Sequence, residues 1–149
     1  MLTPNPREEV RRKLAAVGLG EGQAFITKAP HSEVPGYLVA SDFAFATIKP
    51  APCRLFCPAI KIGEYWASGL PVLVPSGVGD DSAIAEAEGG GAVFDLAQPG
   101  SLAQAFTALT ALLRQPDYRR HIHGMAVRHR NVRRTSEAYA ALLLAAFSV

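Results

Sequence analysis

The sequence has 149 residues, which suits one domain of typical size and is too short for two full ones. Apolar residues make up 49% and charged residues 19%, so the chain can bury a core and does not belong to the disordered class. A net charge of +2 is too small for a dedicated nucleic-acid binder, and we expect no nucleic-acid partner.

The sequence also lacks the signals of membrane insertion and secretion. Its longest apolar run, 138–147, has about half of the roughly 20 residues that span a bilayer. The first residues contain neither the basic nor the apolar part of a signal peptide. Cys53 and Cys57 do not make a disulfide framework and lack a second ligand pair for zinc. We therefore expect a cytoplasmic protein with no transmembrane segment and no metal.

The first half of the chain predicts two helices and two strands. Asn5 as the N-cap and Pro6 as the first helical residue open a helix that ends at a pair of glycines. Residues 23–28 form a short strand and residues 42–49 a second one, with a short helix capped by Ser32 between them. The apolar face of the first helix comprises Val10, Leu14 and Val17.

The second half continues the alternation of helices and strands. Its expected elements are a helix over 58–68 that ends at Gly69, a fully apolar strand over 72–74, a helix that Ser82 caps and that runs through Glu88, a strand over 92–96, and three helices that begin near Ser101, Pro116 and Asn131. Ser101 and Gln104 form a capping box. The inward stripe of that helix comprises Leu102, Phe106, Leu109 and Leu113.

Strands that alternate with helices predict an α/β fold with a parallel sheet. We expect a single truncated Rossmann-like domain over 1–149, with about four strands, helices on both faces, and a helical C-terminal part over about 101–149. Right-handed crossovers bring the carboxyl ends of the strands to one edge, where ligands bind. Lys49, just after a predicted strand, is a candidate phosphate contact at this edge.

The C-terminal helices are rich in arginine. One interpretation is a patch for an acidic partner such as anionic lipid; the other, which we favour, is an ordinary solvated face. In the second interpretation the apolar residues between the arginines point inward, namely Ile122, Met125, Val132, Tyr139, Leu142 and Leu143. The basic residues are Arg114, Arg119, Arg120, Arg128, Arg130, Arg133 and Arg134.

The segment 54–71 carries the strongest functional signal. A loop enters a helix through Pro58, and the first turn of a helix presents unpaired N–H groups that suit phosphate. Lys61 adds a charge there, and Glu64, three residues on, can accept two hydrogen bonds from a ribose diol. A surface Lys–Glu pair worth a few tenths of a kcal/mol explains the same spacing. Both interpretations stay open on spacing alone.

This segment resembles a family of enzymes. Residues 64–72 (Glu-Tyr-Trp-Ala-Ser-Gly-Leu-Pro-Val) are similar to the Glu-x-x-Ala-x-Gly-x-Pro-Val signature of retaining glycosyltransferases with two Rossmann domains, the GT-B type, close to the glycosyl transferases group 1 or family 4. Residues 57–67 resemble a Cys-Ser-Pro-Ile-Lys-x-Gly-Glu-Tyr-Trp-Ala pattern of one branch. The resemblance runs from about residue 8 to 147 and is specific only in its middle.

The resemblance implies a role for each site residue. Glu64 would bind the nucleotide ribose, and Lys61 would lie near the diphosphate. The backbone N–H groups that would hold the diphosphate belong to residues near Pro58, Ala59, Ile60, Lys61 and Ile62. The loop that would lie against the base comprises Lys28, Ala29, Pro30 and His31. Such enzymes act in polysaccharide biosynthesis without a metal or other cofactor, and the nucleotide-diphosphate sugar is their substrate.

The chain departs from the family at two points. A second glutamate that contacts the donor sugar is replaced by Phe56, and Pro58-Ala59 stands where the branch has Ser-Pro, so a capping hydroxyl is lost. The acceptor domain and the first strands of the donor domain are not in this sequence. We therefore expect nucleotide binding without transfer by this chain alone, and a separate acceptor-binding domain or subunit. An open sheet edge also predicts a homodimer.

Several other polar and aromatic residues have plain structural interpretations. We expect Trp66 and Tyr65 to belong to the core, and Asp80 and Asp81 to begin a helix that their charge favours. The remaining histidines are expected at the surface or at an interface, namely His121, His123 and His129.

Overall fold

The computed structural model describes residues 2–55 and 57–147. The chain divides into two compact units, Met1–Tyr37 and Leu38–Val149, and each is described by itself. No helix among the described residues is both long and apolar enough to cross a bilayer.

The first unit contains α1 (Arg7–Ala16) and the short η1 (His31–Glu33), and α2 (Val34–Val39) runs across its end. The predicted cap of α1 is wrong by one residue: Pro6, not Asn5, occupies the N-cap position, and no side chain caps it. Val10 is buried as predicted, whereas Val17 is 73% exposed.

The predicted strand over 23–28 is wrong. This segment makes one isolated parallel bridge, between Leu2 and Thr27. The carbonyl of Ile26 accepts a hydrogen bond from the Arg7 guanidinium at 2.8 Å instead of from a neighbouring strand. A strand needs a ladder of backbone partners, and an alternating sequence cannot supply the partner by itself.

The second unit is built on a parallel sheet with the order β1-β2-β3, formed by β1 (Ala44–Phe45), β2 (Val72–Pro75) and β3 (Gly91–Phe94). The described residues therefore form three strands rather than the predicted four or so. β1 is also shorter than the predicted strand over 42–49. Its pairing with β2 ends at Ala46, whose N–H donates to the Leu73 carbonyl at 2.9 Å.

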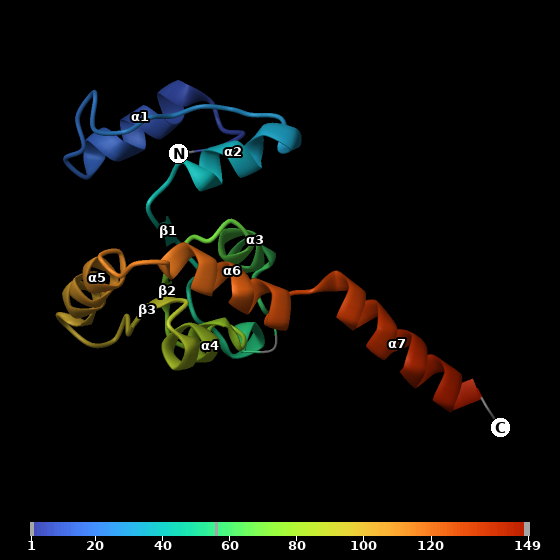
Figure 1. Cartoon of the computed structure of the whole chain (residues 1–149). Helices are drawn as coiled ribbons and strands as arrows, with labels where there is room; N and C mark the ends of the chain where they lie inside the picture. Colours follow the sequence, from blue (N-terminus) through green and yellow to red (C-terminus); the bar gives the residue numbers. More distant parts are fainter. Residues whose placement is uncertain (1, 56, 148–149) are drawn as a thin grey trace. The chain divides into compact units, whose positions relative to one another are not determined.

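Helices cover both faces of this sheet, which confirms the α/β class (Figure 1). The helices are α3 (Ile60–Ala67), α4 (Asp81–Glu88), α5 (Ser101–Leu112), α6 (Tyr118–His129) and α7 (Val132–Phe147), with the short η2 (Pro52–Arg54) before α3. Side chains of α3, α4 and α6 form one core against Val72 and Val74. Ala105 and Leu109 of α5 form the other against Leu73.

The start of α5 differs from the prediction. Gly100 is the N-cap, and the Ser101 hydroxyl accepts a hydrogen bond from the Asp95 N–H at 2.8 Å, so the capping box with Gln104 is wrong. The inward stripe is also narrower than predicted, because Leu102 and Phe106 are about half exposed. Ala105 and Leu109 take the buried positions of this helix instead.

Polar side chains of α6 attach it to neighbouring segments. Arg119 donates to the Val39 and Ser41 carbonyls, and Arg128 pairs with Glu88 at 2.6 Å. The ring nitrogens of His121 and His123 bond the Glu88 and Ala67 carbonyls at the ends of α4 and α3. Several arginines of the predicted basic face are therefore used within the chain, and carboxylates distant in sequence oppose them.

The prediction that apolar residues of the last two helices point inward is confirmed for α6 and wrong for α7. Ile122 and Met125 of α6 are fully buried. Every described residue of α7 is exposed, so the prediction is wrong for Val132, Tyr139, Leu142 and Leu143. The helical period fixes which residues share a face, but it does not say whether another element covers that face.

The contacts of Glu88 predict how the free energy of unfolding depends on pH in the acid range. Hydrogen bonds from Arg128 and then His129 lower the pKa of Glu88 below its ordinary value. A lowered folded-state pKa adds stability above the unfolded pKa of about 4.3, and this stability is lost as the pH falls through the lowered value. Urea unfolding from pH 6 to pH 3 should therefore show a steeper acid loss for the natural chain than for Glu88→Gln.

The matched control is Glu86→Gln, an exposed glutamate on the same helix, which should keep the steep acid loss of the natural chain. Equal acid slopes for Glu88→Gln and the natural chain would show that the Glu88 contacts add no stability.

Candidate functional site

The predicted site lies at the start of α3. Because α3 connects the parallel strands β1 and β2, its first turn lies at the carboxyl edge of the sheet. The helix begins at Ile60, two residues after the predicted start, and Ala59 is its N-cap with extended backbone. We call residues 58–62 the α3 tip. The predicted end is confirmed, since Gly69 follows the C-cap with a φ of +70°.

The backbone of the α3 tip offers fewer N–H groups than its length suggests. Pro58 has none. The Ala59 N–H donates to the Asp81 carboxylate at 2.8 Å, and the Ile62 N–H donates to the Ala59 carbonyl at 2.9 Å. Among the described residues, no backbone carbonyl outside the helix accepts the N–H groups of Ile60 and Lys61, so these two are the groups that a ligand at this tip can use.

The side chains of α3 divide between the core and the surface. Ile62 and Trp66 are fully buried, which confirms Trp66 as a core residue. Ile60, Lys61 and Glu64 are exposed and lie on one face at helical spacing. This face thus combines a positive charge near the α3 tip with a carboxylate one turn further on.

Tyr65, next to Glu64, is partly buried. Its burial and then the negative charge of Glu64 raise the pKa of Tyr65. Tyr65 therefore stays a neutral hydroxyl near neutral pH.

A buried ion pair lies behind the α3 tip. Asp81 is fully buried and Asp80 is exposed, and both lie at the start of α4, as predicted. The predicted cap is wrong, because Asp80 and not Ser82 occupies the N-cap position. The Arg130 guanidinium donates to Asp81 at 2.5 Å and to Asp80 at 2.6 Å. Burial lowers the pKa of Arg130, but the hydrogen bonds to Asp81 and Asp80 outweigh it and raise the pKa above its ordinary value.

The other predicted site residues lie elsewhere. Lys49 is exposed in the loop after β1. Lys28 and Ala29 line a hollow of about 310 Å³ within the first unit, with Leu2, Thr3 and Pro4. Pro30 and His31, also in the first unit, are exposed. Cys53 and Cys57 are exposed free thiols, and the position of Phe56 lies outside the described residues.

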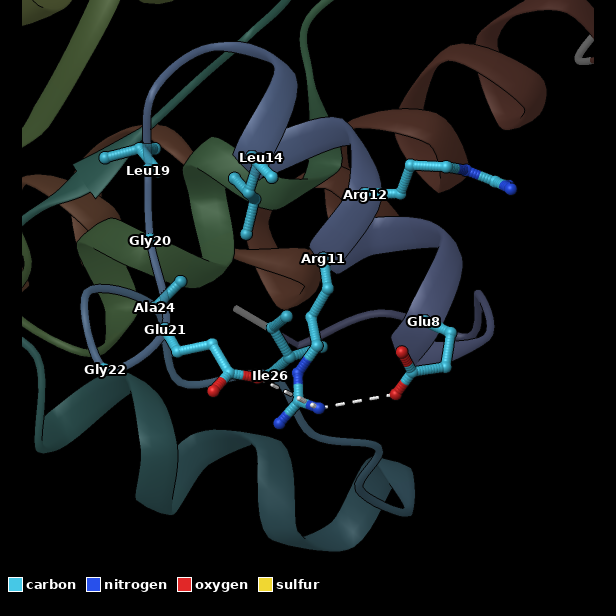
Figure 2. A pocket seen from close by; sticks show the side chains of 11 residues that line it. Glu8, Arg11, Arg12, Leu14, Leu19, Gly20, Glu21, Gly22, Ala24 and Ile26 are labelled. Atoms are coloured by element: carbon cyan, nitrogen blue, oxygen red, sulfur yellow. Dashed lines mark hydrogen bonds and ion pairs between the residues drawn. The ribbon is translucent and has the colours of Figure 1, made fainter.

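The first unit also has a larger hollow, of about 320 Å³, between α1 and the loop that follows it (Figure 2). Arg11 extends across one end of it, 3.3 Å from Glu8 and 3.9 Å from Glu21. Leu14 and Leu19 are at the opposite end in Figure 2. Because two carboxylates already neutralise Arg11, this hollow offers less to an anionic ligand than the α3 tip does.

In comparisons with known proteins, no family model matches the chain and no curated protein matches it significantly. The resemblance to glycosyltransferases therefore rests on the motif of residues 57–72 itself.

Proposed function

We propose that this chain binds the nucleotide-diphosphate part of an activated sugar and is the donor-binding part of a retaining glycosyltransferase. One observation carries the proposal: an exposed lysine and an exposed glutamate lie one turn apart on the helix that begins at the carboxyl edge of a parallel sheet. Three parallel strands covered on both faces are also compatible with part of a Rossmann-like domain. The motif of residues 57–72, which resembles the glycosyltransferase signature, links this geometry to sugar transfer.

In this proposal the diphosphate accepts hydrogen bonds from the N–H groups of Ile60 and Lys61 and faces the Lys61 ammonium. The Glu64 carboxylate accepts the two hydroxyl hydrogens of the ribose, one turn further along α3. When the sugar leaves, negative charge grows on the diphosphate, and these fixed donors stabilise it. An acceptor-binding domain or subunit supplies the hydroxyl group that receives the sugar.

Calorimetric titration tests this proposal. Of UDP, GDP and ADP, at least one should bind, and about 10-fold more tightly than its monophosphate, since the second phosphate adds a charged hydrogen bond. Lys61→Ala should weaken the diphosphate about 10-fold or more and leave the monophosphate much less affected. Lys13→Ala removes an exposed lysine of α1; it is the control and should change neither affinity. No binding of any of these nucleotides by the natural chain would contradict the proposal.

A second candidate is a non-catalytic α/β interaction module whose arginine-rich C-terminal helical face docks on an anionic partner or on an acceptor subunit. The observation that favours it is α7, which exposes Arg133 and Arg134 together with Val132, Tyr139 and Phe147. Salt-sensitive binding to anionic vesicles, with no nucleotide binding, would support this module instead. The homodimer, the cytoplasmic location and the absence of a cofactor remain predictions.

A further inference from the structure

Two loops meet directly behind the α3 tip. The loop after β2 lies so close to the loop before α3 that a Cβ on Gly79 would stand 2.8 Å from the Pro58 Cα. The Gly79 N–H donates to the Arg54 carbonyl at 2.8 Å. Two residues on, the fully buried Asp81 carboxylate accepts the Ala59 N–H. Contacts with the loop after β2 and with the start of α4 therefore fix the position of the α3 tip.

Arg130, at the end of α6, binds the Asp81 carboxylate. Its guanidinium bonds Asp81 and Asp80 and lies 5.7 Å from the centre of the Trp66 ring. A Cβ on Gly63 would stand 3.3 Å from the Arg130 Cγ, so a glycine on α3 leaves room for the arginine stem. Arg130 Nε is buried and has no hydrogen-bond partner among the described residues. The guanidinium is thus fixed between α3, α4 and α6.

We propose that Asp81 and Arg130 are positioning residues of the nucleotide site, an inference that rests on the proposed function. Asp81 fixes the α3 tip by holding the Ala59 N–H, which leaves the N–H groups of Ile60 and Lys61 for the ligand. A buried carboxylate at this place repels an incoming diphosphate, because charges interact strongly where water is excluded. Arg130 cancels that charge and so lets the tip accept an anion.

A double-mutant cycle with inorganic pyrophosphate tests this inference on the full chain. Arg130→Gln leaves two carboxylates without their cation and should weaken pyrophosphate binding about 10-fold or more. Asp81→Asn removes the negative charge, and its amide oxygen can still accept the Ala59 N–H, so it should bind pyrophosphate at least as tightly as the natural chain. The double variant should return to within about threefold of the natural affinity, because neighbouring charges do not act additively.

This rescue separates positioning from simple structural support. A purely structural role for Arg130 predicts that the double variant binds no better than Arg130→Gln, and that result would overturn the inference. Arg128→Gln is the matched control, since Arg128 also pairs with an α4 carboxylate but does so at Glu88, the end of α4 opposite to Asp81. Its pyrophosphate affinity should be unchanged. If Arg130→Gln does not fold, an Asp81→Asn affinity clearly below that of the natural chain overturns the inference.

Amide NMR signals give a second, independent measurement. Pyrophosphate should shift the signals of Ile60 and Lys61 and leave that of Ala59 nearly unchanged. An equal shift at Ala59 would mean that the ligand displaces Asp81, which contradicts the inference. If pyrophosphate follows the predicted cycle but UDP, GDP and ADP bind no more tightly than pyrophosphate, the proposed function fails, and Asp81 and Arg130 are positioning residues of a diphosphate site that does not recognise a nucleotide. If pyrophosphate does not bind the natural chain, the inference fails, and the nucleotide titrations decide the proposed function by themselves.

Discussion

Replacing Trp66 with alanine should lower the free energy of unfolding of the second unit by about 3–5 kcal/mol, the usual cost of deleting a buried indole. The side chain is fully buried between the sheet and α6, and its Nε1–H donates to the Gly90 carbonyl at 2.9 Å. Alanine would leave a large cavity in this core and remove the contact with Arg130. Urea unfolding measures the loss, followed by circular dichroism because Trp66 is the only tryptophan.

Two further variants separate the causes of this loss. Trp66→Phe keeps most of the volume and should cost only about 1–2 kcal/mol, since the Gly90 carbonyl still accepts the Val72 N–H. Tyr139→Ala removes an exposed aromatic ring of α7 and should stay within about 0.5 kcal/mol of the natural chain. A loss below 1 kcal/mol for Trp66→Ala would contradict the described core.

Gly91→Ala should be at least as damaging, with an expected loss of about 4 kcal/mol or more. Gly91 begins β3 with a φ of +155° and pairs with Val72 of β2. A Cβ there would collide with the Val72 carbonyl oxygen and would stand 2.6 Å from the Val72 nitrogen. These are backbone atoms of the central strand, so the pairing of β2 and β3 has to open to make room.

Gly100→Ala is the matched control for Gly91→Ala. Gly100 also has a positive φ, +84°, but a Cβ there would meet no atom within 4 Å. It should cost about 1–2 kcal/mol, the strain of the left-handed backbone alone. The same urea experiment compares the two variants, and equal losses would show that the close approach to Val72 is not what requires Gly91.

Local signals in the sequence predicted the centre of the fold correctly. The apolar run 72–74 between two prolines belongs to the fully buried β2, because a strand that is covered on both faces has apolar residues in succession. Gly69 and Gly89 end α3 and α4 in the left-handed conformation that glycine adopts without strain. The expected burial of Trp66 was also correct, since its spacing from Ile62 places both side chains on one helix face.

Features that depend on distant partners could not be predicted in this way. Residues 23–28 have a strand-like composition, but their pairing depends on whether another strand lies beside them. Ser101 has the right spacing for a cap, yet its hydroxyl bonds the Asp95 N–H instead. Arg130 and Asp81 are 49 positions apart, and no spacing rule connects them. For the site, the sequence indicated Lys61 and Glu64 but not the carboxylate that occupies the Ala59 N–H.

The most direct test of the central claim is whether Glu64 recognises the ribose diol. The measurement is calorimetric titration of the tightest-binding nucleoside diphosphate and its 2′-deoxy form, with the natural chain, Glu64→Ala and Glu86→Ala. The natural chain and Glu86→Ala should bind the ribose form about 10-fold or more tightly than the deoxy form, as expected for a charged hydrogen bond. Glu64→Ala should bind both forms equally and weakly. If Glu64→Ala keeps the preference for the ribose form, the claim is contradicted.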